Sequence, residues 1–451
     1  MSKLFTLIGI TLFNCQIMAM DLQEALVSAY NSNEDLKASR SNFLSSIESS
    51  PQAISEFLPD ISASMSENKT RQTNRSRYGN TGATSKIDNF EKNISINQSI
   101  FNGGGSVARL KAAQSDFRAA RGQYYVNEQK VILAAIQTYL NYYETKEKFN
   151  ITATSVNSNK KQLEAVQEKL NVGETTGTEV AQAKAALSNA ETKKLSAYAN
   201  FQAARANFVQ TFNIEPENIT IPIIPQDLPK TFDDFLAKSL ENNQTIIAAK
   251  HTRVASKARE LGAKSALLPT VGLSVAGRRN FYNPENPNTS SQNNSDVTAS
   301  LSVNIPIFIK GGAAYSNIRQ AKNSTRSSVI QLDSTIKQIN ASCITSWENF
   351  NTAKYSITAA EEGVEAAQIA YDGTMQEELL GSKTIVEVLI AEDALNQAKV
   401  NKVENTTQYI LAAYQIKALV GQLTAKSLKL KAKYFSPEDE LKKAKIKVVG
   451  F

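Results

Sequence analysis

The amino-acid sequence predicts a mainly α-helical chain with a small β part, in which one unit of helix, β-hairpin and long helix occurs twice. Three observations predict this fold class: an internal duplication, four short segments in which apolar and polar residues alternate, and long stretches without proline. Glycine (19) and proline (11) are scarce in a chain of 451 residues. Such a composition favours long uninterrupted helices over a fold rich in loops.

The duplication is clearest in two segments that lie 208 residues apart. NVGETTGTEVAQAKAAL at 171–187 and LLGSKTIVEVLIAEDAL at 379–395 share a glycine, a threonine, a Glu-Val pair, two alanines and the final leucine. The shared glycines are Gly173 and Gly381. A glycine between two helical patterns commonly ends the first helix, so we expect each of them to reverse the chain.

A second pair of matches follows the same spacing. Gly103 and Gly104 align with Gly311 and Gly312, and each pair stands where an alternating segment gives way to a long helical one. We expect these glycines to form the turns from strand to helix. Composition alone could produce matching alanines, but it would not place paired glycines in register, so we interpret the chain as a tandem duplication.

The first twenty residues have the layout of a secretory signal. Lys3 precedes an apolar run at 4–13, and small or polar residues follow up to Ala19. This pattern predicts export, with a buried N-terminal helix as the alternative. Cys15 raises the alternative of a lipid anchor, but the Phe-Asn before it matches such a signal poorly. Cleavage would leave Cys343 as the single cysteine, so no internal disulfide is expected.

Together these features divide the chain into five expected parts. They are a signal peptide at 1–20, a first repeat at 21–215, a proline-rich linker at 216–229, a second repeat at 230–427 and a lysine-rich tail at 428–451.

Each repeat is expected to contain one β-hairpin. The segment 297–305 alternates valine, alanine, leucine, valine and isoleucine with serine, threonine and asparagine, a period of two that indicates a strand with one apolar face. Similar alternation predicts strands at about 60–70 and 90–101 in the first repeat. The second repeat has them at about 270–282 and 296–308.

Four strands cannot close into a barrel, and their open edges invite association. Strands of outer-membrane barrels alternate apolar residues that face lipid with polar residues that face the lumen. Since the chain also carries an export signal, we expect its strands to lie in a membrane. Three chains would supply twelve strands and a closed barrel, whereas two would supply eight, too few for an open lumen. The sequence therefore favours a homotrimer.

The helical part is unusually long. Residues 103–170 contain no proline, and as a helix they would measure about 100 Å. In the segment that follows Gly173, apolar residues recur with alternating spacings of three and four, the pattern of a coiled-coil seam. The seam positions are Val180, Ala183, Leu187, Ala190, Lys194, Ala197, Phe201, Ala204 and Phe208.

With its export signal, its duplicated units, the two Gly…Glu-Val segments and the closing LAAYQIKALVGQL, the chain resembles the TolC-like outer-membrane efflux protein family. The resemblance extends over about 21–428. It implies a homotrimer with a twelve-stranded barrel in the outer membrane and a helical tunnel in the periplasm, with the 216–229 linker at its equator. It also implies a periplasmic adaptor, an inner-membrane pump or ABC transporter, and outer-membrane lipid as partners. The cargo, drugs or proteins, stays open.

The resemblance places the duplicated segments at the periplasmic tip, where coiled coils close the tunnel. It assigns the role of a gate residue to Glu387, and it implies that Lys383 pairs with an acid of the first repeat, Glu179. Where the family has a second acidic residue, this chain has Ile390, so we expect a single ring of Glu387 carboxylates. Acids that simply flank a coiled-coil seam are the alternative for both glutamates.

No catalytic residue, metal site or cofactor is expected. The chain has one histidine, which excludes a Ser-His-Asp triad or a histidine-rich metal site. The net charge of +7 is spread along helical faces, so no nucleic acid partner is expected. A trimeric coiled-coil surface adhesin or structural envelope protein is the alternative to a transport conduit, although neither requires a second hairpin. An exported hydrolase or lyase lacks the clustered side chains it would need.

Overall fold

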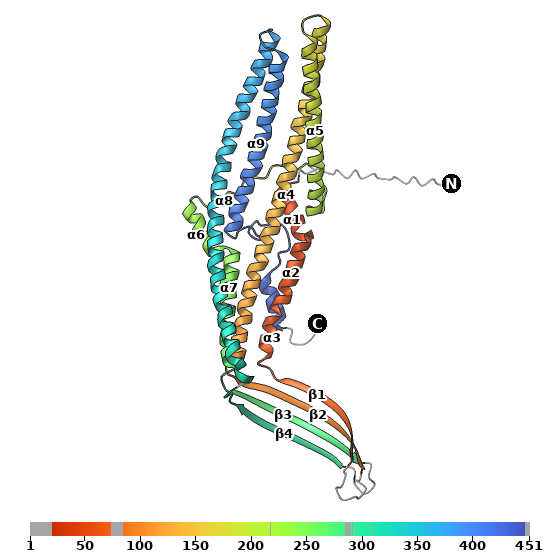
Figure 1. Cartoon of the computed structure of the whole chain (residues 1–451), viewed down its shortest axis with the longest axis vertical. Helices are drawn as coiled ribbons and strands as arrows, with labels where there is room; N and C mark the ends of the chain where they lie inside the picture. The colour runs from red at the N-terminus through yellow and green to blue at the C-terminus, as the bar shows by residue number, and fades with distance from the viewer. Residues whose placement is uncertain are drawn as a thin grey trace, which may run out of the picture. The chain divides into compact units, whose positions relative to one another are not determined.

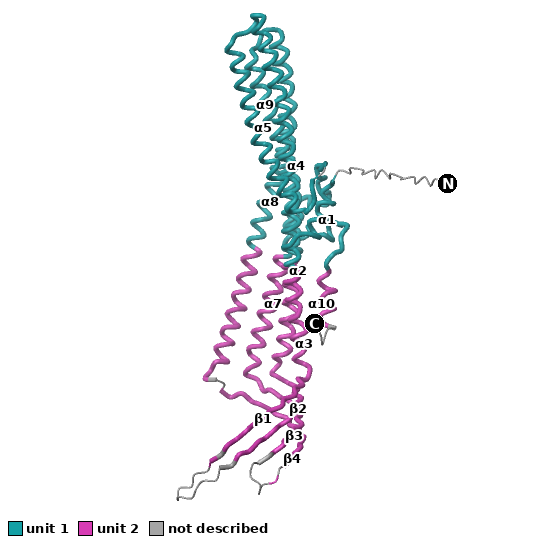
Figure 2. Tube along the Cα trace, turned by 90° about the vertical axis from the view of Figure 1, so that its right-hand side faces the viewer, with its two compact units in different colours: residues 1–39, 125–244, 337–435 teal, residues 40–124, 245–336, 436–451 magenta. Residues whose placement is uncertain are grey.

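The structure is a computed structural model, and it describes residues 20–73, 84–216, 218–284, 290, 292–308 and 310–446. Apart from Met20, the expected signal peptide at 1–20 lies outside these residues, and so does Cys15. Internal contacts divide the chain into two units (Figure 2). Unit 1 comprises residues 1–39, 125–244 and 337–435, and unit 2 comprises 40–124, 245–336 and 436–451.

The described elements confirm the predicted fold class, mainly helical with one small antiparallel sheet (Figure 1). The same order of elements occurs twice. The first half contains α1 (Leu22–Ser32), α2 (Glu34–Ile47), α3 (Ser49–Ser55), β1 (Asp60–Thr73), β2 (Thr84–Asn102), α4 (Gly105–Asn171) and α5 (Gly177–Phe212). The second half contains α6 (Phe232–Asn242), α7 (Gln244–Ser265), β3 (Thr270–Pro284), β4 (Gln292–Asn304), η1 (Lys310–Gly312), α8 (Ala313–Leu379) and α9 (Ile385–Leu419), followed by α10 (Pro437–Ile446).

The two long helices confirm the expectation drawn from the missing prolines. α4 and α8 have 67 residues each, about 100 Å at the usual rise per residue. The helices that return, α5 and α9, have 36 and 35 residues. Each long helix and its return helix therefore form a helical hairpin, and we call α4–α5 the first hairpin and α8–α9 the second.

The helix before each β-hairpin is broken, whereas the sequence pattern predicts one continuous helix. Asn33 separates α1 from α2 with an extended backbone (φ −61°, ψ 124°), and its side-chain oxygen accepts a hydrogen bond from Leu36 N at 2.9 Å. Asn243 separates α6 from α7 with nearly the same angles. Asparagine competes with helical hydrogen bonding by capping the next turn, which explains both breaks.

The four strands form one sheet in the order β1-β2-β3-β4, with every neighbouring pair antiparallel. The central ladder, β2 with β3, joins the two halves of the chain. Three strand boundaries differ from the prediction by four residues or more: β2 begins at Thr84 rather than near residue 90, and β4 runs from Gln292 to Asn304 rather than from 296 to 308. Pro306 follows β4 and has no N–H to donate to a ladder, which explains the early end.

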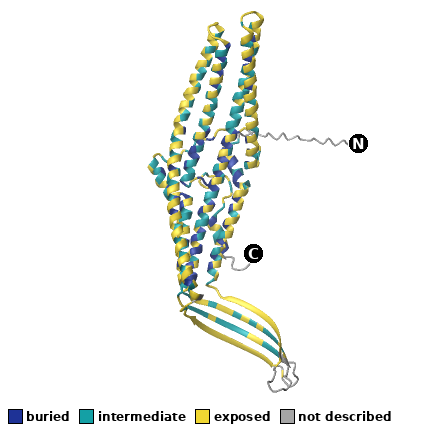
Figure 3. Cartoon of the chain, viewed as in Figure 1, coloured by how far each residue is buried: buried dark blue, intermediate teal, exposed yellow. Residues whose placement is uncertain are grey.

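The register places apolar and polar residues on opposite faces of the sheet. Ile61, Ile96 and Val275 lie side by side on one face, which we call the apolar face. On the other face Ser62 and Ser95 are opposite each other, with their hydroxyl oxygens 2.8 Å apart. The apolar face is uncovered in the chain and its edge strands are the most exposed (Figure 3). Its exposed members include Ile61, Met65, Ile94, Ile96, Leu273, Val297, Leu301 and Val303.

The turns from strand to helix contain the predicted glycines. Gly103 and Gly104 stand between β2 and α4 with φ of +65° and +80°. Gly311 and Gly312 lie in η1, between β4 and α8, with φ of +58° and +89°. This left-handed backbone is costly for other residues, so it accounts for the glycines in both repeats.

The interior of unit 1 is held by aromatic side chains. In the first hairpin Tyr142 of α4 packs between Phe201 and Phe208 of α5, with ring centroids 5.4 and 5.2 Å away. In the second half Phe235 of α6 lies on Trp347 of α8, with the centroids 5.8 Å apart. These rings lie several helical turns away from the hairpin ends, so they support the helices whose far ends form the site described next.

Candidate functional site at the ends of the helical hairpins

Each hairpin reverses at the predicted glycine. Gly173 has φ +81° and Gly381 has φ +79°, and no described atom lies within 4 Å of a Cβ added at either one. Gly173 N donates to Leu170 O at 3.0 Å, which satisfies a carbonyl at the end of α4. Gly381 N makes the matching bond to Glu378 O at 2.9 Å. Both turns thus use glycine for its backbone conformation.

A capping box starts the return helix of the second hairpin. Thr384 Oγ1 accepts a hydrogen bond from Glu387 N at 3.4 Å, and Glu387 Oε2 accepts one from Thr384 N at 2.8 Å. Lys383 Nζ adds an ion pair to Glu387 Oε1 at 2.7 Å. The Lys383 ammonium and then the Thr384 amide lower the pKa of Glu387 to about 2. Glu387 is therefore negatively charged across the whole physiological pH range in the single chain.

The Lys383–Glu179 pair expected from the resemblance is not formed within the chain. Glu179 stands at the same position of the first hairpin, where its N–H donates to Thr176 Oγ1 at 3.4 Å and its carboxylate accepts from Thr175 Oγ1. Each glutamate is held by the start of its own helix, which is nearer than any partner on the other hairpin. The residue at the second acidic position, Ile390, is 65% exposed.

An apolar contact joins the two hairpins close to their turns. Val166 of α4 is buried with Ile385 and Val388 of α9, and each of the three is at most 6% exposed. Lys169 Nζ of α4 adds an ion pair to Glu378 Oε1 of α8 at 2.5 Å. Val388 aligns with the seam position Val180 of the first repeat, 208 residues earlier, so its burial follows from the seam pattern. That pattern does not predict Val166 and Lys169 as residues of the other hairpin at this contact.

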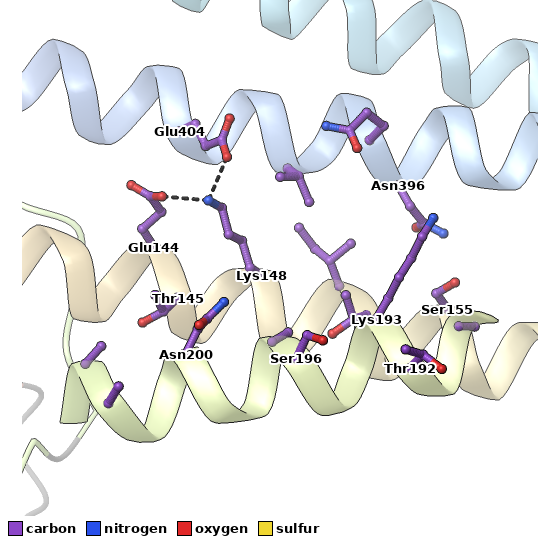
Figure 4. Close-up of a pocket in the computed structure, with 18 of the residues that line it drawn as sticks. Glu144, Thr145, Lys148, Ser155, Thr192, Lys193, Ser196, Asn200, Asn396 and Glu404 are labelled. Carbon is purple, nitrogen blue, oxygen red and sulfur yellow. Dashed lines mark hydrogen bonds and ion pairs between the residues drawn. The ribbon is translucent and has the colours of Figure 1, made fainter. Parts of the chain in front are cut away.

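Farther along unit 1, polar side chains line a cavity of about 820 Å³ between α4, α5 and α9 (Figure 4). Lys148 of α4 reaches Glu144 at 2.7 Å and Glu404 of α9 at 2.6 Å. Burial lowers the pKa of Lys148, but the hydrogen bonds to these two carboxylates outweigh it and leave the pKa raised. Nearer the turns, Lys193 of α5 pairs with Asp393 of α9 at 2.5 Å. The cavity is thus crossed by ion pairs that hold the second hairpin to the first.

One buried carboxylate in this interface forms no ion pair with any cation of the described residues. Glu392 of α9 is 5% exposed, and its Oε2 accepts a hydrogen bond from Gln162 Nε2 of α4 at 2.8 Å. Burial raises the pKa of Glu392, and the negative charge of Asp393 raises it further. Glu392 aligns with position 184 of the first repeat, which is not a seam position, so the sequence pattern does not predict its burial.

We expect Glu392→Gln to stabilise unit 1 at pH 7 by roughly 1 kcal/mol. The pKa of Glu392 is higher in the folded state than in the unfolded chain, where it is about 4.5. The folded state therefore loses stability as pH rises above 4.5, and the loss is complete once pH exceeds the raised pKa. Glutamine keeps an acceptor for Gln162 and carries no charge. Thermal unfolding in detergent, measured from pH 4 to 8, should show a gain that disappears at the acidic end.

The matched control is Asp393→Asn, which removes an exposed acid from the next position of the same helix. It should lose the Lys193 ion pair and gain no stability at any pH. A Glu392→Gln protein that unfolds more easily than the parent at pH 7 would contradict the argument.

Among the described residues, no group of three or more His, Cys, Asp or Glu side chains is arranged to hold a metal ion. None of the described helices combines the length and the apolar character needed to cross a membrane.

The fold and the hairpin ends define a class of protein, that of the outer-membrane channels. The outer-membrane channel CmeC of Campylobacter jejuni superposes with a TM-score of 0.77 over 94% of this chain and 89% of its own, at 18% sequence identity. The family model for outer membrane efflux proteins matches the chain twice, over residues 25–213 and 235–422. The chain belongs to the outer membrane efflux protein family.

Relatives are similar along nearly the whole chain. The outer membrane efflux protein BepC of Brucella suis is 27% identical over 98% of this chain and 94% of its own length. The outer membrane protein TolC of Escherichia coli is 24% identical over 94% of this chain and 87% of its own. The chain is an outer-membrane efflux channel with a tunnel part in the periplasm.

Proposed function

We propose that three copies of the chain form one closed passage through the outer membrane and the periplasm, and that the hairpin ends gate it. The apolar face of the sheet carries the first half of the proposal. Four strands with an uncovered apolar face are stable in lipid only when their edges are paired, and three copies provide the twelve strands of a closed barrel. The two matches to the family model support the proposed repeats, 21–215 and 230–427.

The gate proposal depends on Glu387 at the end of the second hairpin. Its carboxylate is about two-fifths exposed, and its low pKa keeps it charged. Three such carboxylates around a threefold axis would attract cations and repel anions at the narrowest point. Lys383 neutralises part of this charge and orients the carboxylate. In this proposal Glu387 selects cations over anions, and Lys383 reduces the strength of that selection. Gly173 and Gly381 allow the tight reversals that bring the helix ends to the entrance.

The proposed partners follow from the relatives. Efflux channels and secretion channels span only the outer part of the envelope, so a periplasmic adaptor and an inner-membrane pump or ABC transporter would supply cargo and energy. The protease secretion protein PrtF of Dickeya chrysanthemi is 21% identical over 84% of this chain and 82% of its own length. Because of this likeness, both proteins and drugs remain candidate cargoes. The proposed role is passive conduction, without catalysis, cofactor or nucleic acid.

Glu387→Ala should weaken cation selectivity severalfold when the purified protein conducts in a planar bilayer, because the ring charge at the constriction is removed. The reversal potential in a salt gradient measures this effect. Glu365→Ala is the matched control: it removes an exposed acid of α8 that lies well away from the turn, and it should leave selectivity nearly unchanged. Equal selectivity in parent and Glu387→Ala would remove Glu387 from the gate.

The assembly has a separate test. Native mass spectrometry of the detergent-solubilised protein should show three chains per particle. A stable particle of one chain with both sheet edges protected from hydrogen exchange would overturn the passage model while leaving the fold intact.

A further inference from the structure

Two cations and two aromatic rings form a cluster on the apolar face of the sheet, in the half that lies toward the β-hairpin loops. Lys92 of β2 is directly opposite Arg279 of β3, and the next pair on the same face is Phe90 with Phe281. The Lys92 ammonium lies 5.5 Å from the Phe90 ring centroid, and the Arg279 guanidinium lies 5.0 Å from that of Phe281. We call these four residues the basic–aromatic cluster.

Both cations of the cluster lack a carboxylate partner among the ion pairs of the described residues. The neighbouring charges are already matched: Lys69 pairs with Glu67 at 3.3 Å on the same face, and Arg278 pairs with Glu91 at 3.1 Å on the opposite face. Asp88 lies opposite Lys69 in the register and adds to that matched group. Like charges directly opposite each other on a sheet are destabilising, so the cluster favours an anion from outside the chain.

A shallow depression of about 280 Å³ lies beside the two cations. Ile94, Gly277 and Val297 are opposite one another in the register and form its apolar floor. Gly277 has no atom within 4 Å of an added Cβ, so the missing side chain leaves this space open. Ser295, opposite Arg279, adds a hydroxyl to the rim. Arg278 and Asp296 also border the depression, although the register places both on the opposite face of the sheet. On the apolar face, the site thus combines an apolar floor with the two cations and a hydroxyl group along one edge.

The depth of the cluster agrees with a lipid headgroup. Val271 to Phe281 is the length of β3 from one end of the apolar face to the aromatic pair, and its 11 residues fall within the roughly 9–11 that a tilted strand needs to cross the hydrocarbon layer. Aromatic side chains mark the membrane–water boundary, and lysine and arginine beside them extend toward phosphates. Arg279 can bind a phosphate through two N–H groups, and Lys92 acts as a point charge.

We propose that the basic–aromatic cluster binds the phosphate group of an anionic membrane lipid, with one acyl chain lying over Ile94, Gly277 and Val297. The lipid phosphate would supply the negative charge that no carboxylate of the described residues provides to Lys92 and Arg279. It would also cover the depression that Gly277 leaves between Ile94 and Val297. The location of the chain in the outer membrane places such a lipid against this face.

The test is native mass spectrometry of the full-length protein in neutral detergent, titrated with dioleoyl phosphatidate. The same chains without phosphate, as dioleoylglycerol, are the second probe, and inorganic phosphate is the third. We expect the parent to retain phosphatidate at least roughly tenfold better than dioleoylglycerol, and the Lys92→Gln/Arg279→Gln variant to lose that preference. Inorganic phosphate should not displace the lipid at millimolar concentration.

The matched control is Lys69→Gln/Arg278→Gln, which removes the same two charges from residues that already have carboxylate partners. It should keep the preference for phosphatidate. Equal retention by both double variants would overturn the proposal, as would a parent that does not distinguish phosphatidate from dioleoylglycerol. Displacement of the lipid by inorganic phosphate would show a simple anion site and would also overturn it. A Gly277→Leu variant, which fills the depression and keeps both cations, should lower retention of the acyl chains.

Discussion

Gly103→Ala should destabilise unit 2 by roughly 3 kcal/mol or more. The new Cβ would lie 2.6 Å from Ser265 O and 2.8 Å from Leu268 Cβ, at a φ of +65° that alanine rarely adopts. Both obstacles belong to the end of α7 and the segment that follows it, so the substitution would push β2 away from its junction with the helices. Thermal unfolding in detergent measures the loss.

Gly104→Ala separates the two causes. Its φ of +80° is as unfavourable, but no atom lies within 4 Å of its added Cβ. It should therefore cost roughly 1–2 kcal/mol, the price of the left-handed backbone alone. If the two variants were equally stable, the close approach to Ser265 would not matter, and the tight junction between β2 and α7 would be refuted.

Val388→Asp should release the second hairpin from the first near their turns and cost about 3 kcal/mol or more. Val388 is 2% exposed and is buried with Val166 and Ile385, so an ionised side chain there would be removed from water and surrounded by apolar groups. Amide hydrogen exchange should become faster over about 160–172 and 382–392, while the sheet keeps its protection. If the hairpin ends gate the channel, conductance in bilayers should rise as well.

The control for this variant is Ile390→Asp, two positions along the same helix. Ile390 is 65% exposed, so its stability should change by less than about 0.5 kcal/mol. It introduces the same charge without opening the apolar contact. Faster exchange in Ile390→Asp than in Val388→Asp would show that charge, rather than loss of packing, separates the hairpins.

Much of the fold follows from local rules that sequence patterns report well. The scarcity of proline predicts helices of the observed length, and the period-two segments predict the four strands to within a few residues in most places. The glycines at positions 103, 104, 311 and 312 have positive φ, and this backbone requirement explains why glycine occurs at these positions in both repeats. Seam positions such as Val388 are buried because a 3.5-residue spacing keeps them on one side of the helix.

Partners across the hairpins could not be predicted in the same way. Which residue of α4 faces Glu392 depends on the rotation and offset of two helices, and no pattern within either helix records these. The expected Lys383–Glu179 pair does not form within the single chain because Glu387 lies one helical turn from Lys383 and also caps Thr384. The breaks at Asn33 and Asn243 were hidden because asparagine at a helical position is only weakly unfavourable until its side chain finds a backbone N–H.

The order of the strands has a consequence for how copies of the chain can meet. One border of the sheet is β1, from the first half of the sequence, and the other is β4, from the second half. These two borders run in opposite directions, because each neighbouring pair of strands is antiparallel. Copies that enter the membrane in one orientation therefore pair antiparallel when β4 of one copy meets β1 of the next, and such head-to-tail additions continue until the accumulated rotation brings the last copy back to the first. Ring size is then decided by the curvature that each copy contributes, so a single residue that alters the twist of β2 against β3 could change the number of subunits without touching any contact between them.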